Sequence, residues 1–356
     1  MSVAIEDIER ARRIVGPVLH RTPLLSSRGL GERIGAAAFF KAENLQRTGS
    51  FKPRGAVYAV ACLSETQRSA GIVTMSAGNA AQAIAFAAGS AGVRVTVAMP
   101  QTAPKTKVDA TRGYGADVVF APDVTKLIAL VQEIRDRTGA YFLHPYDDAA
   151  MIAGHGTCAL EILEDLPDAD LFVVGVGGGG LIAGIAVAVA ARRPSARVVG
   201  VEPSGAPAMR RALDAGEPVR LERVNTIADG LAAPIAGTIP LEIVKRLVSD
   251  VVLVEDDVIA EGVRFLATRA KLVAEPAGAA ATGALRRGET AHRVDGASRL
   301  ERAGALQVLS LQEGTGADPL AQPAARKERR AMKHRCYCAA GPFDVVDRHA
   351  HEPRLP

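Results

Sequence analysis

Lys52 is the residue of this chain with the greatest potential for covalent chemistry. It stands in residues 50–56, Ser-Phe-Lys-Pro-Arg-Gly-Ala, among small, turn-forming and apolar residues and just before an apolar segment that predicts a helix. A lysine ammonium that loses its hydrating water has a lowered pKa and becomes a nucleophilic amine, as Schiff-base chemistry requires. Because most lysines on loops are simply solvated, this interpretation depends on two segments further along the chain.

Both of these segments predict binding sites for anions. Residues 76–82, Ser-Ala-Gly-Asn-Ala-Ala-Gln, follow a strand-like segment and open a helix-like one, so backbone N–H groups at the helix start can bind a carboxylate. Residues 177–181, four glycines and a leucine, lie in a similar setting, and glycines let the backbone direct several N–H groups at a phosphate. An amine, a carboxylate site and a phosphate site together indicate an amino-acid substrate and a phosphorylated aldehyde cofactor.

The glycine-rich segment also fits a different class of protein. Residues 175–180 satisfy the G-x-G-x-x-G pattern of dinucleotide-binding proteins, and Glu202 ends the next strand-like segment, where such proteins keep a ribose-binding acid. This alternative predicts an NAD-dependent oxidoreductase. It leaves Lys52 and the Ser-Ala-Gly-Asn segment unexplained. Phosphate binding by glycines is common to both interpretations, so Lys52 is the residue that distinguishes them.

Several motifs, in the same order along the chain, resemble those of the fold-type II pyridoxal-phosphate enzymes. The segments around Lys52, Asn79 and the four glycines are joined by Ile-Ala-Gly-His-Gly-Thr at 152–157, Gly-Val-Glu-Pro at 200–203 and Glu-Pro-Ala-Gly-Ala at 275–279. Within this family the chain is most similar to the threonine/serine dehydratase and serine racemase branch. The resemblance implies pyridoxal 5'-phosphate as cofactor. It also implies an α/β fold like tryptophan synthase β, with two lobes of open parallel sheets and flanking helices.

The resemblance also implies roles for individual residues. Lys52 would hold the cofactor covalently and, once freed, remove the substrate Cα proton as a general base. Asn79 would contact the ring hydroxyl of the cofactor, and Ser310 would face its pyridine nitrogen. The substrate carboxylate would be bound by Ser76, Ala77, Gly78, Asn79 and Ala80. The cofactor phosphate would be bound by Gly177, Gly178, Gly179, Gly180 and Leu181.

The reaction implied by the resemblance is β-elimination of L-threonine or L-serine to 2-oxobutanoate or pyruvate plus ammonia. Ala77 stands where racemases of this type carry a second serine as the opposite-face acid and base, which favours an ammonia-lyase. Ala80 replaces the usual histidine, so the choice among threonine, serine and hydroxyaspartate stays open. A serine racemase, a β-replacement enzyme and an inactive relic are the alternatives, beside the oxidoreductase.

Glu202 is a candidate ligand for a divalent cation. Many relatives bind a cation through a glutamate, a backbone carbonyl and a second carboxylate shortly after. Here the resemblance supplies Glu202 and the carbonyl of Ala206, but Ala208 occupies the position of the second carboxylate. One carboxylate makes a weak divalent site, so we do not expect tight Mg²⁺ binding.

Strand-like and helix-like segments alternate along the chain, which predicts α/β units with mainly parallel sheets. The strand-like segments are residues 37–41, 71–75, 94–99, 117–121, 171–174, 197–201 and 251–254, and helix-like ones include 80–90, 105–113, 124–138 and 154–166. The resemblance implies a discontinuous large lobe of residues 1–57 and 147–285 that binds the cofactor, and a small lobe of residues 58–146.

Residues 286–356 do not fit the pattern, because they become rich in Arg, Ala, Gly and His. They predict a divergent or partly disordered tail, or alternatively a frame-shifted segment that leaves the large lobe without its closing strand. Ser310 falls in this part and lacks the Gly-Gly-Asn that the family places after it.

Composition favours a cytoplasmic enzyme that acts on a small molecule. The 356 residues are 48% hydrophobic, and a net charge of +4 without a basic stripe argues against nucleic acid as a partner. Residues 171–190 are uncharged and long enough to span a membrane, but their glycines favour a buried strand, loop and helix. The N-terminus carries acids and predicts no signal peptide. We therefore expect an amino-acid substrate, no membrane partner and a homo-oligomer.

Overall fold

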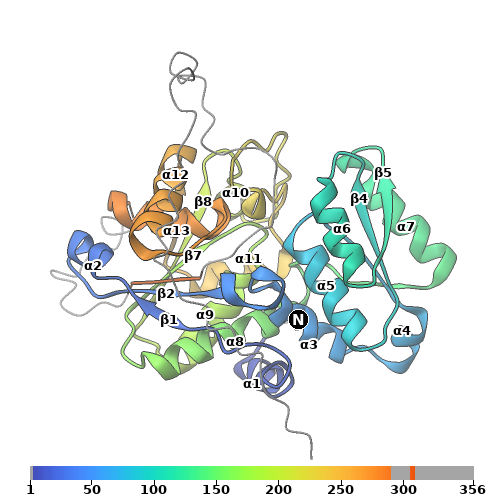
Figure 1. Cartoon of the computed structure of the whole chain (residues 1–356), viewed down its shortest axis with the longest axis horizontal. Coiled ribbons are helices and arrows are strands. Elements are labelled where there is room, and N and C mark those ends of the chain that lie inside the picture. The colour runs from blue at the N-terminus through green and yellow to red at the C-terminus, as the bar shows by residue number, and fades with distance from the viewer. Residues whose placement is uncertain (1–2, 290–304, 309–356) are drawn as a thin grey trace, which may run out of the picture. The chain divides into compact units, whose positions relative to one another are not determined.

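Two sheets organise the chain (Figure 1), seen here in a computed structural model that describes residues 3–289 and 305–308. The strands are β1 (Leu24–Ser26), β2 (Ala38–Lys41), β3 (Ile72–Met75), β4 (Val95–Pro100), β5 (Asp117–Ala121), β6 (Tyr141–Phe142), β7 (Leu171–Gly175), β8 (Arg197–Pro203), β9 (Asp250–Val254) and β10 (Ala305–Val308). One sheet has the order β1-β2-β10-β7-β8-β9, and the other has the order β5-β4-β3-β6. Only the β1–β2 pair is antiparallel among the described strand pairs. The predicted α/β fold is confirmed.

The helices lie between the strands in sequence, as the alternation of segments predicts. They are α1 (Ile5–Val15), α2 (Arg28–Ile34), α3 (Lys52–Ala61), α4 (Glu65–Ala70), α5 (Asn79–Ser90), α6 (Lys105–Gly113), α7 (Leu127–Thr138), α8 (Ala149–Asp165), α9 (Gly180–Arg192), α10 (Ala208–Ala215), α11 (Thr238–Leu247), α12 (Asp256–Phe265) and α13 (Pro276–Arg287). Helix α8 begins five residues before the predicted helix at 154–166. The reason is its cap, because the Asp148 carboxylate accepts the Met151 N–H at 2.9 Å.

Strand β10 changes the interpretation of the predicted tail. Its residues pair in parallel with β2 on one side and with β7 on the other, with Ala305 opposite both Ala38 and Leu171. Residues 305–308 therefore supply the strand that closes the large sheet. A frame-shifted segment was expected to lack this strand. The remaining residues after 289, with Ser310 among them, lie outside the described residues.

Both faces of the larger sheet are covered by helices. On β7, Phe172 and Val174 belong to a buried cluster with residues of α8 and α9, whereas Leu171 and Val173 belong to one with residues of α12 and α13. A strand buried on both faces is apolar throughout, which is why residues 171–174 carry no alternation. The uncharged run at 171–190 accordingly forms β7, a loop and α9, and within the described part of the chain no helix is both long and apolar enough to cross a membrane.

The four-stranded sheet is also covered on both faces. Val73 and Ala98 pack with residues of α7, whereas Ile72, Val97 and Met99 join the alanines of α5 in the main core. Helix α3 contacts both α5 and α8. It therefore lies between helices that pack on different sheets, and Lys52 is its first residue.

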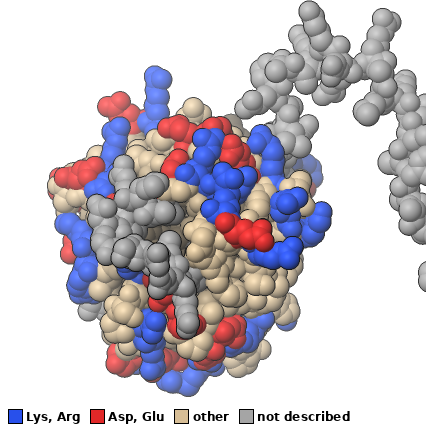
Figure 2. Space-filling model, turned by 90° about the vertical axis from the view of Figure 1, so that its left-hand side faces the viewer, with Lys and Arg blue, Asp and Glu red and all other residues tan. Residues whose placement is uncertain are grey.

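The surface shown in Figure 2 carries charges of both signs. Lys and Arg side chains lie interspersed with Asp and Glu and with uncharged residues on this face. Over the described residues as a whole, several surface charges form ion pairs, such as Arg287 with Glu261 and Arg137 with Glu133. Exposed pairs of this kind add little to stability.

Candidate active site

Lys52 lies where α3 begins, after two short turns at Glu43–Leu45 and Arg47–Gly49. Its Nζ is 4.9 Å from the centre of the Phe51 ring. Burial lowers the pKa of Lys52 to about 8, while the nearby Glu275 carboxylate acts in the opposite direction. At pH 7 about one molecule in ten then carries the neutral amine, against roughly one in 3,000 for an unperturbed lysine. The lowered pKa agrees in direction with the interpretation of the sequence, although Lys52 as a whole residue is only partly buried.

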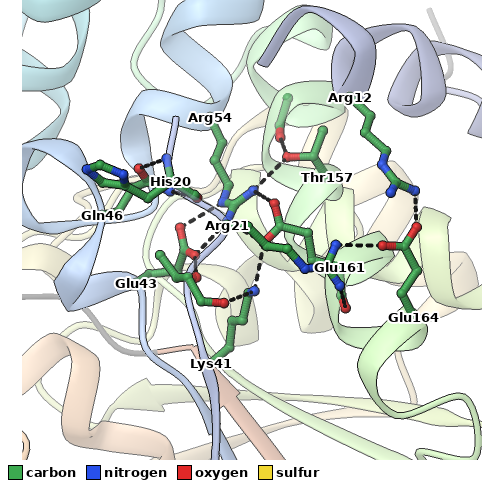
Figure 3. A network of polar contacts seen from close by, with 12 residues as sticks. Arg12, His20, Arg21, Lys41, Glu43, Gln46, Arg54, Thr157, Glu161 and Glu164 are labelled. Atoms are coloured by element: carbon green, nitrogen blue, oxygen red, sulfur yellow. Dashed lines mark hydrogen bonds and ion pairs between the residues drawn. The ribbon is translucent and has the colours of Figure 1, made fainter. Parts of the chain in front are cut away.

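A buried cluster of charges holds the first turn of α3 (Figure 3). The Arg54 guanidinium donates to both oxygens of Glu43, at 2.7 and 2.8 Å, and to both oxygens of Glu161, at 2.7 and 2.8 Å. Lys41 at the end of β2 donates to Glu161 at 2.7 Å. Two cations and two carboxylates thus balance each other, and Arg54 and Lys41 are both fully buried. The cluster fixes α3 against β2 and α8 two residues from Lys52.

Glycines set the spacing between α3, α8 and α9. A Cβ on Gly154 of α8 would lie 2.3 Å from the carbonyl oxygen of Arg54, and one on Gly184 of α9 would lie 2.3 Å from that of Ile152. The backbone of α8 is therefore in direct contact with that of α3 and with that of α9. The position of α8 thus determines how far the start of α3 lies from the start of α9. His155 of α8 is fully buried, and burial together with Lys52 holds its pKa well below the usual value.

The four glycines form the turn between β7 and α9. Gly179 has a φ of 94° and precedes the first residue of α9, Gly180. A Cβ on Gly178 would lie 2.3 Å from the ring of Tyr146, whose hydroxyl donates to the carbonyl of Ile235 at 3.0 Å. The segment therefore has no room for side chains at its centre, and it presents the N-terminus of a helix of 13 residues.

The Ser-Ala-Gly-Asn segment forms the turn between β3 and α5. Gly78 is the residue before α5 and has no side chain, so no side chain caps the first N–H groups of the helix. Ser76, Ala77 and Gly78 are partly exposed, whereas Asn79 and Ala80 are buried. Asn79 Nδ2 donates to Glu275 Oε1 at 2.9 Å, and Asn79 Oδ1 is buried without a hydrogen-bond partner in the described part of the chain.

Glu275 and Gly230 connect the three predicted segments. The Glu275 carboxylate binds Asn79 and acts on the charge of Lys52. Its Oε1 is 3.3 Å from the position of a Cβ on Gly230, and the Gly230 carbonyl is 3.3 Å from the position of a Cβ on Gly177. The structure therefore brings Lys52, the Asn79 helix start and the glycine segment to one place. Sequence reasoning gave no role to Glu275, although an acid directly before a Pro-Ala-Gly helix start was visible.

Glu202 has a structural partner at each oxygen. It is fully buried in β8, and its carboxylate accepts the N–H groups of Met209 and Arg210, both at 2.8 Å, at the start of α10. Burial raises the pKa of Glu202 to about 8, against the effect of these two hydrogen bonds. Residues 3–289 and 305–308 contain no group of three or more His, Cys, Asp or Glu suited to a metal. The role of Glu202 as a metal ligand stays a prediction.

These residues fit the chemistry of pyridoxal phosphate. An amine with a lowered pKa suits an aldehyde, and a side-chain-free helix start suits a phosphate. A second uncapped helix start suits the substrate carboxylate, and the unpartnered buried oxygen of Asn79 leaves one polar atom for a ligand.

Comparison with known proteins gives the same family. The family model described as pyridoxal-phosphate dependent enzyme matches residues 15–300. The chain is 43% identical to an L-threonine ammonia-lyase of Thermotoga maritima, covering 80% of this chain and 71% of that protein. It is 42% identical to the catabolic L-threonine dehydratase of Escherichia coli, covering 81% and 88%.

Solved structures agree with the sequence comparisons. The structure of maize serine racemase has a TM-score of 0.83 with 33% identity and covers 88% of this chain and 95% of that chain. A threonine deaminase structure from T.th. has a TM-score of 0.80 with 36% identity and covers 88% and 99%. The family predicted from the motifs is confirmed, and this chain belongs to the pyridoxal-phosphate dependent enzymes.

Proposed function

We propose that this protein is an ammonia-lyase that eliminates water across the Cα–Cβ bond of L-threonine or L-serine. Water then hydrolyses the resulting enamine, which releases ammonia and gives 2-oxobutanoate or pyruvate. The observation that carries the proposal is Lys52, whose pKa is lowered to about 8 where α3 begins, beside the Asn79 helix start. The identity of 42–43% to a threonine ammonia-lyase and a threonine dehydratase supports the same reaction. Bound pyridoxal phosphate would supply an electron sink for the negative charge that develops at Cα.

In this proposal different residues of the chain bind the cofactor, orient the substrate and take up the proton. Lys52 binds the cofactor aldehyde, and its released amine takes the proton from Cα. The backbone of Ser76, Ala77, Gly78, Asn79 and Ala80 orients the substrate carboxylate, and that of Gly177, Gly178, Gly179, Gly180 and Leu181 holds the phosphate. The start of α9, at Gly180, adds the positive end of a helix dipole for the phosphate.

We also propose the remaining features predicted from the sequence. The large lobe comprises residues 1–57 and 147–285, the small lobe comprises residues 58–146, and the cofactor binds between them. The enzyme works as a cytoplasmic homo-oligomer. It needs no tightly bound divalent cation, because Glu202 is the one carboxylate of the implied ligand set and Ala208 occupies the position of the second.

The products should distinguish a lyase from a racemase. Ala77 has no hydroxyl to donate a proton to the opposite face of Cα, so L-serine should give pyruvate and ammonia with little D-serine. L-Threonine should give 2-oxobutanoate. Chiral chromatography and a keto-acid assay on the same samples measure both outcomes, and D-serine forming faster than pyruvate would show that the protein is a racemase.

Gly178→Asp should weaken the binding of pyridoxal phosphate at least about 10-fold, or 1.4 kcal/mol. The new carboxylate repels the phosphate, and its Cβ would press on the ring of Tyr146 at 2.3 Å. Gly113→Asp is the matched control, because a Cβ on Gly113 meets no atom within 4 Å. Titration of the apoprotein with the cofactor gives the dissociation constants. Equal values for the two variants would exclude this turn as the phosphate site.

A further inference from the structure

His155 is a buried titratable side chain that takes no part in the proposed reaction. It lies on α8 with 0% of its surface exposed, and neither Nδ1 nor Nε2 has a hydrogen-bond partner in the described part of the chain. Two unpaired polar atoms in the interior carry a free-energy cost, so a fold that keeps them needs a reason. The position of the imidazole ring supplies that reason.

The ring packs against the turn of chain that carries the Lys52 amine. Its Nε2 is 2.5 Å from the position of a Cβ on Gly55, so any larger residue at 55 would collide with the imidazole. The Phe51 ring contacts the imidazole edge to face, with the two ring centres 5.0 Å apart. Because Phe51 and Gly55 lie on either side of Lys52 in sequence, His155 supports the start of α3 from behind.

The glycines on either side of His155 bring two further helices to the same point. A Cβ on Gly154 would lie 2.6 Å from the Cα of Gly55 in α3, and one on Gly156 would lie 2.9 Å from the carbonyl oxygen of Gly184 in α9. His155 therefore carries its side chain where α8 touches both α3 and α9. The size and the hydrogen bonding of this side chain are suited to set the spacing of the two helices.

The imidazole of His155 is neutral and carries one N–H. Burial is the main cause of its lowered pKa, and the cations of Lys52 and Arg54 act in the same direction. Backbone groups of Gly180 and Lys52 act on this pKa in the opposite direction, as carbonyl oxygens near a ring N–H do. They lie near the ring without the geometry of a hydrogen bond. A neutral imidazole has one donor and one acceptor, so its single N–H is available to the backbone where α3 and α9 begin.

We propose that His155 is a positioning residue that fills the space between the starts of α3 and α9 and shares its N–H with the backbone there. It thereby fixes the separation between the amine of Lys52 and the phosphate-binding turn before α9. The inference rests on the proposed function, because pyridoxal phosphate must reach both places at once. The aldehyde and the phosphate are two ends of one molecule, so a wrong separation weakens binding of the whole cofactor without weakening binding of either end alone.

Separate titrations with the cofactor and with its two ends test this role. Apoprotein of the full chain is titrated with pyridoxal 5'-phosphate, with pyridoxal, which lacks the phosphate, and with inorganic phosphate, which lacks the ring. His155→Met should bind pyridoxal 5'-phosphate at least about 10-fold more weakly, because an error of about 1 Å in position can cost about 100-fold. The dissociation constants for pyridoxal and for inorganic phosphate should each stay within about 2-fold of the wild type.

A conservative variant and a matched control complete the test. His155→Gln retains a donor and an acceptor and should keep the affinity for pyridoxal 5'-phosphate within about 3-fold of the wild type. His155→Leu replaces His155→Met if that variant does not fold. His20→Met removes an exposed imidazole and should bind all three compounds like the wild type.

Three outcomes would overturn the inference. They are unchanged binding of pyridoxal 5'-phosphate by the Met variant, an equal loss for pyridoxal or for inorganic phosphate alone, and a Gln variant as weak as the Met variant. Failure of the proposed function is a separate observation. In that case the wild-type protein itself forms no borohydride-reducible link between the cofactor and Lys52.

Discussion

Lys52→Ala should abolish the covalent link to pyridoxal phosphate and lower the lyase rate by at least about 1,000-fold. The variant loses both the amine that binds the aldehyde and the base that takes the Cα proton, and a positioned base alone contributes 10²- to 10⁴-fold. The long-wavelength absorbance of the Lys52-bound cofactor should disappear with the activity. Absorption spectra and a keto-acid assay on the purified variant measure both effects.

Lys105→Ala is the matched control, because Lys105 is an exposed lysine on α6. It should keep both the absorbance and the rate. Borohydride reduction of the wild-type protein followed by peptide mapping should place the cofactor on Lys52. A label on Lys41, which is buried and bound to Glu161, would refute the assignment.

Arg54→Met should lower the free energy of unfolding by about 3–5 kcal/mol. The substitution removes one of the two cations that face Glu43 and Glu161 and leaves buried negative charge without a partner. Urea unfolding of the apoprotein, followed by circular dichroism, measures the change. The same substitution at the exposed Arg28 of α2 should change stability by less than about 0.5 kcal/mol. Equal midpoints for the two variants would show that the buried cluster does not stabilise the fold.

The sequence carried enough information for the architecture and for most of the candidate site. Residues 171–174 predict a buried parallel strand because they are apolar on both faces, and the glycines that follow predict a turn into a helix. The structure has β7 and α9 at these places. Local composition is sufficient for this strand and turn because neighbours in sequence create them. The prediction for Lys52 needs more, because its apolar surroundings indicate a nucleophilic amine only together with the two anion-binding segments further along the chain. Burial in the folded protein is the main cause of its lowered pKa.

Features that depend on distant partners could not be predicted in the same way. Arg54 looks like an ordinary basic residue in its motif, and its burial follows from Glu161, 107 residues later. The partner of Asn79 lies 196 residues away, so nothing local indicates the role of Glu275. Strand β10 is four residues long, too short for an alternation to be recognised, and its place in the sheet is determined by β2 and β7.

The position of β10 has a consequence for the order in which the protein can assemble on the ribosome. In the large sheet β2 pairs with β1 and β10, and β7 pairs with β8 and β10. The amino-terminal hairpin is made first, but the strand that joins it to β7 is translated after every other described element. Until then the nascent chain carries two unsatisfied strand edges, which attract other unfolded chains. Completion of the sheet therefore waits for the carboxyl-terminal part of the chain, whatever the speed at which the earlier helices form.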